Sequence, residues 1–206
     1  MLNLDELVAP GRAALITVEV QENVVGAGSV VPALAEAAAD ILPLIGSLAA
    51  AARAAGVPVV HCTVDARPDG KGANRNARLF AAMGKGRAVG PPGPTRPATV
   101  HAAIGATDAD IVLGRLHGLS PMTGTSLDPV LRNLGVSTIV VTGVSVNVAV
   151  LGLAFEAVNH GYQLVIPRDG VAGVDDAYVD TLFAGTLSLL ATVTTTEALL
   201  GAWRTT

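Results

Sequence analysis

The sequence predicts an α/β protein, a three-layer α/β/α fold with an about six-stranded, mostly parallel, Rossmann-like sheet. Short segments rich in β-branched residues alternate about six times with segments that carry helix start and stop residues. Hydrophobic residues make up 50% of the chain and aromatic residues only 3%, so small and branched side chains must form the core. Such side chains are typical of buried parallel strands that are covered by closely packed helices.

The expected strands are short apolar runs bounded by glycine or polar residues. The first of them, AALITVEV, is apolar on both faces until Glu19, as expected for a strand with helices on both sides. Strands are expected at residues 13–20, 57–63, 110–114, 137–142, 162–166 and 191–194.

The expected helices lie between these strands. Asp40 is the expected N-cap of a long helix that stops at Gly56. Thr194 and Glu197 have the spacing of a capping box at the start of the last helix. Further helices are expected at residues 125–134, 148–159 and 175–190, with a turn at 143–147 and an irregular region at 65–99 that contains a Gly/Pro-rich loop, Gly84–Pro97.

Length and charge restrict the class of protein. We expect one domain over residues 1–206. The net charge of −4 predicts no binding to nucleic acid or to an anionic membrane. Residues 1–10 lack the basic start of a signal peptide, and no uninterrupted apolar run of membrane-spanning length is found. Cys62 is the only cysteine, which excludes an internal disulfide, and a cytoplasmic location is expected.

Charged side chains that follow the strands are the candidate catalytic residues, because an open parallel sheet binds ligands beyond the carboxyl ends of its strands. Glu19 ends the first strand, where burial requires a charged partner or raises the pKa, as a general acid or base needs. Arg115 follows the third strand and is its natural partner, and His117 is a candidate proton carrier. Each also has a structural interpretation: a buried ion pair for Glu19, a solvated cation for Arg115 and a loop hydrogen bond for His117.

Other candidate groups lie in the 143–147 turn and the second strand. The turn precedes a helix, so its N–H groups could hold an anion or an oxyanion, or it is an ordinary strand-to-helix junction. Cys62 is interpreted as a small core residue and not as a nucleophile, because its neighbour His61 points to the opposite face of the strand. The four histidines lack metal-ligand spacing, and no glycine-rich nucleotide motif follows the first strand, so we expect no metal and no cofactor.

The order of four segments resembles the isochorismatase-like (cysteine hydrolase) family. ALITVEVQ at 14–21 is similar to its first strand, which ends D-x-Q, and RAAGVPVVH at 53–61 to its helix-to-strand passage. DIVLGRLHGLSPMTGTSL at 110–127 is similar to the stretch that carries a lysine and ends in G-T-x-L. Residues 134–162 are similar to its G-V-x-T-x-x-C-V turn and helix. The resemblance implies the fold predicted above, a small-molecule substrate and a homo-oligomer.

The catalytic aspartate, lysine and cysteine of that family are all replaced here. The resemblance puts Glu19 at the aspartate position and Ala149 at the cysteine position. The lysine position falls on Arg115 when counted from the start of its segment and on Leu116 when counted back from its end. Alanine cannot form an acyl-enzyme, and arginine does not carry protons. The isochorismatases proper also lack the cysteine and use their acidic residue to protonate a vinyl ether before water adds, a role open to Glu19.

Three functions are therefore compatible with the sequence. The first is a hydrolase without a covalent intermediate, with Glu19, Arg115 and His117 as catalytic residues. The second is a catalytically inactive member that binds a small molecule or a partner protein, and the third is a subunit active only in a hetero-oligomer. The substrate-binding residues implied for the first are Gln21, Ser145, Asn147 and Ala149.

Overall fold

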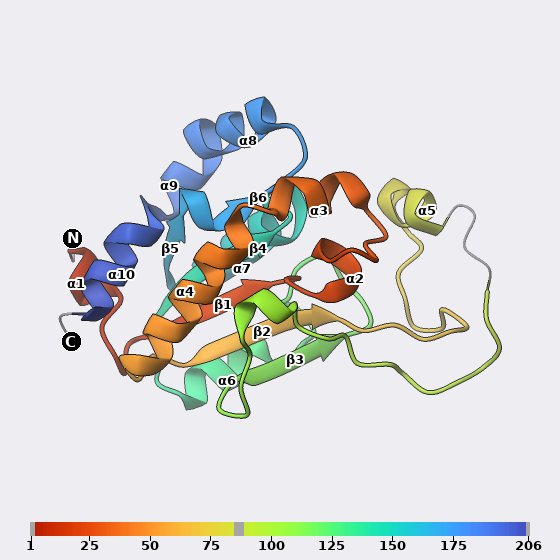
Figure 1. Ribbon diagram of the computed structural model, residues 1–206, viewed down its shortest axis with the longest axis horizontal. Coiled ribbons are helices and arrows are strands. Elements are labelled where there is room, and N and C mark those ends of the chain that lie inside the picture. Colours follow the sequence, from red (N-terminus) through yellow and green to blue (C-terminus); the bar gives the residue numbers. More distant parts are fainter. Residues whose placement is uncertain (1–2, 85–88, 205–206) are drawn as a thin grey trace.

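A parallel β-sheet forms the centre of the protein (Figure 1). The computed structural model describes residues 3–84 and 89–204. Within these residues the sheet has seven strands in the order β3-β2-β1-β4-β5-β7, and the short β6 pairs with β4. The strands are β1 (Ala13–Val18), β2 (Val59–Val64), β3 (Ile111–Arg115), β4 (Thr138–Val144), β5 (Gln163–Pro167), β6 (Val171–Ala172) and β7 (Thr192–Thr194).

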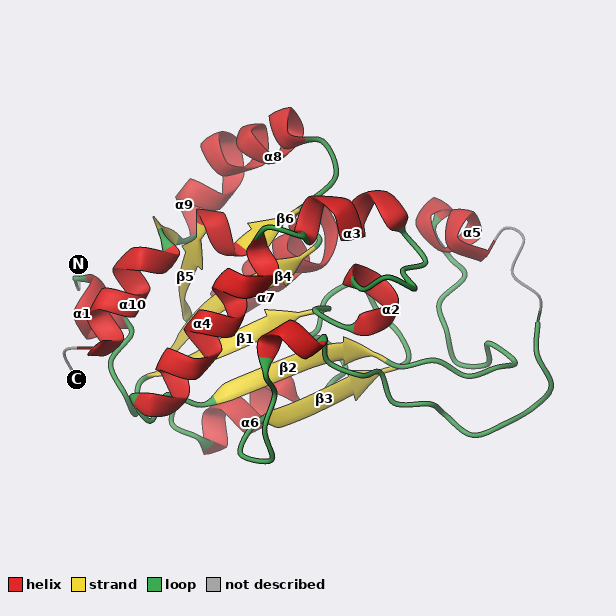
Figure 2. Cartoon of the chain, viewed as in Figure 1, coloured by secondary structure: helices red, strands yellow, loops and turns green. Residues whose placement is uncertain are grey.

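Helices cover both faces of the sheet, which makes the predicted three-layer α/β/α fold (Figure 2). One face is covered by α1 (Leu4–Leu7), α3 (Pro32–Ala38), α4 (Ile41–Ala54) and α10 (Thr196–Arg204). The other is covered by α6 (Leu127–Asn133), the π-helix η2 (Val146–Val150), α7 (Leu151–Asn159), α8 (Asp176–Leu182) and the π-helix η4 (Phe183–Leu187). The remaining elements are α2 (Glu22–Val25), α5 (Arg78–Gly84), η1 (Ala102–Ile104), η3 (Arg168–Gly170) and α9 (Ser188–Leu190).

Alternation along the strands divides the core into two layers, because successive side chains point to opposite faces. Ile16 and Val18 of β1 pack with the α6 and α7 side chains, whereas Leu15 packs with those of α4 and α10. Both layers are fully buried on β1, which explains why this strand reads as a continuous apolar run.

A row of buried polar side chains interrupts the apolar layer between the sheet and α4. Thr17 and His61 are register partners on β1 and β2, and the Thr17 hydroxyl lies 2.7 Å from His61 Nδ1. His61 Nε2 lies 3.2 Å from Asp110, whose carboxylate also receives two 2.8 Å hydrogen bonds from Arg53. Burial lowers the pKa of His61, so the neutral ring donates from Nε2 to Asp110 and accepts the Thr17 hydroxyl at Nδ1.

The six predicted strands are all present, with ends shifted by at most two residues. Two local predictions were wrong, and some short elements were missed. Strand β4 continues through Val144 and η2 begins at Val146, so residues 143–147 do not form a turn. The region predicted as irregular contains α5. The side chain that caps α10 is Thr195, which accepts from the Ala198 N–H, and not Thr194. The sequence prediction also missed β6, which is only two residues long.

The predicted Gly84–Pro97 loop is partly described. Gly84 is the last residue of α5, and residues 85–88 lie outside the described part of the chain. Further on, Arg96 and Ala66 exchange backbone hydrogen bonds of 2.8 and 3.2 Å, which fixes this end of the loop beside β2's exit. Among the described helices none is by itself long and apolar enough to cross a membrane; α3 and α4, bent by 58° at their junction, reach that length and apolarity only together.

Candidate functional site

The carboxyl ends of β1 and β3 bring Glu19 and Arg115 together, as the sequence predicted. Arg115 Nη2 donates a hydrogen bond to Glu19 Oε1 across the intervening strand β2. The Arg115 side chain is 3% exposed and that of Glu19 is 19% exposed. Of the two residues that the resemblance offers for the lysine position, Arg115 is the one that contacts Glu19.

Backbone geometry holds Glu19 at this position. Its φ of 55° is left-handed, which is uncommon for a residue other than glycine, and its N–H donates to the Cys62 carbonyl at 2.9 Å. The neighbouring strand approaches closely at Gly143, where φ is +108° and a Cβ would lie 2.3 Å from the Val18 carbonyl oxygen. Only glycine can occupy that position beside the end of β1.

The charge of Glu19 is controlled by two opposing effects. Burial raises the pKa of Glu19 above its ordinary value, and the adjacent Arg115 guanidinium offsets part of that rise through its charge and its hydrogen bond. Arg115 Nη1 also reaches the Thr63 carbonyl at 3.4 Å, and Nη2 reaches the Leu119 carbonyl at 3.3 Å. Its Nε has no hydrogen-bond partner within the described residues.

The side chain of Gln21 is buried and hydrogen-bonded to neighbouring segments of the chain. Its carboxamide exchanges two hydrogen bonds with the backbone of Val64, of 2.7 and 3.0 Å, and donates a third to Asn23 at 2.6 Å. The residue is fully buried and lines neither of the two cavities described below. These contacts tie the end of β1 to the end of β2 and use both N–H donors of the Gln21 amide and one of the two acceptor sites of its oxygen.

The three other predicted substrate-binding residues lie at the start of η2. Ser145 and Asn147 are half-buried, and Ala149 is 2% exposed within the apolar layer that also contains Met122. The Ser145 carbonyl accepts the N–H groups of Val148 and Val150, so this segment is a helix start as expected. Neither cavity described below is lined by Ser145, Asn147 or Ala149.

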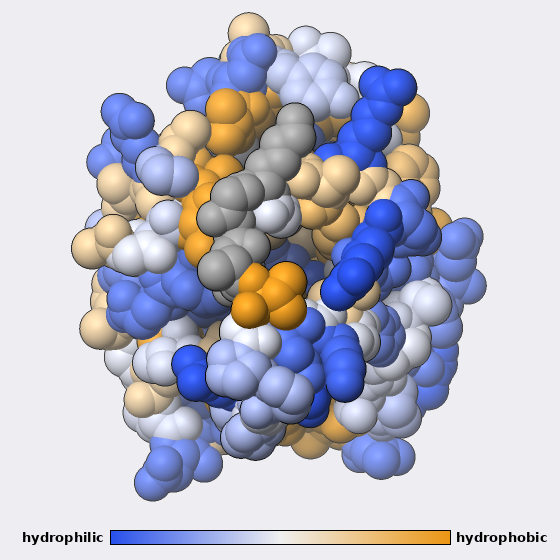
Figure 3. Space-filling model, turned by 90° about the vertical axis from the view of Figure 1, so that its right-hand side faces the viewer, coloured by the Kyte–Doolittle hydropathy of each residue, from blue (hydrophilic) through white to orange (hydrophobic). Residues whose placement is uncertain are grey.

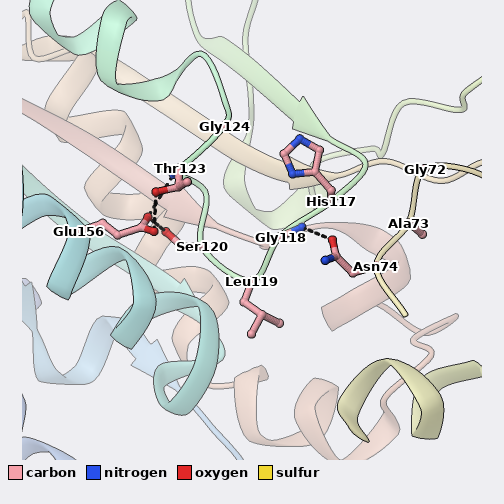
Figure 4. A pocket seen from close by; sticks show the side chains of 10 residues that line it. All are labelled: Gly72, Ala73, Asn74, His117, Gly118, Leu119, Ser120, Thr123, Gly124 and Glu156. Carbon is pink, nitrogen blue, oxygen red and sulfur yellow. Dashed lines mark hydrogen bonds between the residues drawn. The ribbon is translucent and has the colours of Figure 1, made fainter. Parts of the chain in front are cut away.

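Two adjoining cavities lie beside the end of β3. One, of ≈ 560 Å³, is an open depression whose polar lining includes Asn74, Ser120 and Glu156 (Figure 4). The other, of ≈ 530 Å³, is lined in part by Arg115 and Asp65. Exposed His117 lines both. The surrounding face of the molecule mixes hydrophilic and hydrophobic residues (Figure 3).

Glu19 lines neither of these cavities, which only partly agrees with the predicted site. Arg115 connects the two places, because its guanidinium contacts Glu19 while the residue also lines the second cavity. His117 also lines the second cavity. Within the described residues it has no hydrogen bond to Arg115 or to Glu19.

Cys62 is a core thiol, as predicted. It packs in the same apolar layer as Val18 and Ala149, on the face of β2 opposite to the hydrogen-bonded ring of His61. Burial raises the pKa of the Cys62 thiol to about 12, so it is protonated near neutral pH and a poor nucleophile.

Glu156 is a residue of this region that the sequence analysis missed. It lies on α7, accepts hydrogen bonds from the hydroxyl of Ser120 and from Thr123, and has a lowered pKa because these donors outweigh its desolvation. The available signal was its spacing of seven residues, or two helical turns, from Ala149, which puts both on one face. Among the described residues no group of three or more His, Cys, Asp and Glu side chains is arranged to hold a metal ion.

The sheet order, the two helical layers and the charge pair at the strand ends define a Rossmann-like α/β protein. The isochorismatase domain model matches residues 13–198, and the chain belongs to the isochorismatase family. It is 33% identical over 163 residues to the isochorismatase family protein YecD of Escherichia coli O157:H7, covering 76% of this chain and 77% of that protein.

Solved structures of the family have the same fold. An isochorismatase family protein from Burkholderia thailandensis superposes with a TM-score of 0.76 at 27% identity, covering 94% of this chain and 96% of that one. A cysteine hydrolase from Pseudomonas syringae pv. phaseolicola 1448A also gives 0.76, at 26% identity, with 97% and 95% covered. The family resemblance expected from the sequence is confirmed.

Proposed function

We propose that this chain is a hydrolase of small molecules that works without a cysteine nucleophile, with Glu19 as general acid and base. The observation that supports it is the Glu19–Arg115 pair at the carboxyl ends of β1 and β3, the two strands on either side of β2. A buried ion pair adds little stability compared with apolar side chains of the same volume, so its presence at this position favours use in chemistry.

In the proposed reaction Glu19 begins as the neutral acid. A water oxygen forms a bond to the electrophilic carbon of the substrate, the bond from that carbon to the leaving atom breaks, and the Glu19 proton passes to the leaving group. The proton released by the water returns to the carboxylate, which restores the starting state. The raised pKa of Glu19 suits this exchange, because a general acid needs a pKa close to the working pH.

The other residues have supporting roles in this proposal. Arg115 fixes the Glu19 carboxyl and offers its positive charge to an anionic group, and His117 offers a hydrogen bond from the adjoining cavity. The segment from Ser145 to Ala149 presents the start of η2 to a developing negative charge. Gln21, the remaining substrate-binding residue that the sequence predicted, also holds the strand ends together through Val64.

The test is turnover by the purified chain on a panel of vinyl ethers, amides and carbamates. We expect turnover of at least one compound, loss of that turnover in Glu19→Gln, and unchanged turnover in the matched control Glu36→Gln, whose side chain is exposed on α3. A Glu19→Gln variant as active as the parent would remove Glu19 from the mechanism.

A second candidate function is a catalytically inactive member that binds a small molecule. The specific observation in its favour is that Glu19 lines neither of the two cavities described above and that Ala149 is only 2% exposed, so neither residue faces these cavities. This function predicts that calorimetry detects binding of a compound from the same panel while no turnover occurs with the parent chain. A homo-oligomeric state and a cytoplasmic location stay predictions.

A further inference from the structure

The loop that follows β3 is fastened to α7 by one carboxylate. Ser120 donates its hydroxyl to Glu156 Oε2, and the Thr123 N–H donates to the same oxygen at 3.1 Å. The Thr123 hydroxyl donates to Oε1 at 2.6 Å. Glu156 therefore holds both ends of the short segment 120–123, and Figure 4 shows the three side chains converging.

The surface of α7 is shaped to receive this loop. A Cβ at Gly152 would lie 3.3 Å from Ser120 Cβ, so a larger residue there would press the loop away from the helix. Ala149, Gly152 and Glu156 are spaced by three and four residues and share one face of the helical segment. The loop therefore lies along the helix face that begins at Ala149.

The same loop supplies a partner to Arg115. Leu119, which directly precedes Ser120, accepts a hydrogen bond from Arg115 Nη2 at 3.3 Å. The Thr63 carbonyl is the other backbone acceptor, at 3.4 Å. Both distances are near the upper limit for a hydrogen bond, so a loop displacement of a few tenths of an ångström removes the Leu119 contact.

We infer that Glu156 is a positioning residue for the Glu19–Arg115 pair, acting through Ser120 and the Leu119 carbonyl. This inference rests on the proposed function, because it assigns to Glu156 the role of keeping Arg115 beside Glu19, the proposed general acid. When the loop is released, Arg115 loses a fixed acceptor and its guanidinium spends less time against Glu19. The charged form of Glu19 is then less well stabilised.

Few other titratable groups act on these carboxylates among the described residues. Arg115 of β3 and the Cys62 thiol of β2 face Glu19. His160, which directly follows α7, is a titratable neighbour of Glu156, and its electrostatic interaction contributes to lowering the pKa of that carboxylate. Loss of the Glu156 charge by itself can only lower the Glu19 pKa, so a rise in the Glu19 pKa on altering Glu156 must pass through Arg115 and the loop.

The experiment measures the pKa of Glu19 by NMR on protein carrying ¹³C-labelled glutamate, with the resonance assigned by its loss in Glu19→Gln. Glu156→Gln replaces one carboxylate oxygen with an N–H₂ group and removes the negative charge that strengthens the hydrogen bonds from Ser120 and Thr123, so it weakens the attachment of the loop even where a hydroxyl turns to accept. We expect the Glu19 pKa to rise by about 0.5 to 1 pH unit in this variant and to stay unchanged in the control Glu36→Gln.

A second variant keeps the inference testable if Glu156→Gln does not fold. Ser120→Ala removes only the link next to Leu119 and leaves both Thr123 contacts in place, and the same direction of shift is expected. A Glu19 pKa equal to that of the parent in both variants, with only the melting temperature lowered, would overturn the inference and leave Glu156 a purely structural residue. Because the measurement needs no substrate, its outcome is separate from the turnover test of the proposed function.

Discussion

The buried Asp110 carboxylate makes the sharpest prediction for stability, and Asp110→Asn is the perturbation. Four donors converge on this side chain: Arg53 Nε and Nη2 at 2.8 Å each, the Thr107 N–H at 2.9 Å and His61 Nε2 at 3.2 Å. The carboxylate is 1% exposed. Asparagine has nearly the same shape but replaces one acceptor oxygen with a donor, so at least one of these hydrogen bonds must break.

The magnitude follows from the ionisation of Asp110. Its hydrogen-bond donors and the Arg53 charge outweigh desolvation and lower its pKa from 3.8 to about 2. That difference corresponds to about 2 kcal/mol of folding free energy at neutral pH. For a chain of this size we expect the melting temperature of Asp110→Asn to fall by about 4 to 8 °C.

The pH dependence has a definite sign. Because the folded pKa lies below the unfolded value, the contribution of Asp110 is complete above pH 3.8 and is lost as the pH falls through about 2. Urea unfolding of the parent and of Asp110→Asn, measured between pH 7 and pH 2, gives the difference directly. We expect this difference to be constant near neutral pH and to shrink below about pH 4.

The matched control is Asp108→Asn, an exposed aspartate two residues earlier in the chain. Its unfolding free energy should agree with the parent within about 0.5 kcal/mol. The reasoning is refuted if Asp110→Asn is as stable as the parent at pH 7, or if its deficit persists unchanged at pH 2.

Three further predictions concern the site and its supports. Because burial raises the pKa of Glu19, its contribution to stability is complete below pH 4.5 and decreases as the pH rises through the folded value. Urea unfolding should therefore show the parent losing stability relative to Glu19→Gln above pH 4.5, and a constant difference would contradict this. Cys62, with a pKa of about 12, should resist thiol reagents at pH 8 until the chain unfolds; rapid labelling of the native protein would show an accessible thiol. Gly143→Ala should destabilise the fold by more than about 2 kcal/mol in urea, because its Cβ would overlap the Val18 carbonyl at a positive φ. The exposed Gly28, with open space around it, should tolerate the same change, and equal losses at both glycines would refute the steric argument.

The sequence by itself determined the layers, the strands and the pair at the strand ends. A strand that is buried on both faces is a continuous apolar run. The sequence of β1 and of β4 was therefore enough to predict each strand without knowing which strands lie beside it. The rule that ligands bind beyond the carboxyl ends of parallel strands then selected Glu19 and Arg115 from the charged residues. They are 96 residues apart, and the sheet brings them into contact as expected. That the chain forms one domain over residues 1–206 stays a prediction.

Only the tertiary structure decided what surrounds that pair. It showed that the Gln21 carboxamide is occupied by the Val64 backbone, that Glu156 clamps the loop after β3, and that Glu19 lines neither cavity. The spacing of Glu156 from Ala149 indicates a shared helix face, but the contacts themselves have no local signature, because a side-chain hydrogen bond depends on which distant group the fold brings within about 3 Å. Periodicity records which face of an element is buried. It does not record which polar group on another element will meet a given side chain there.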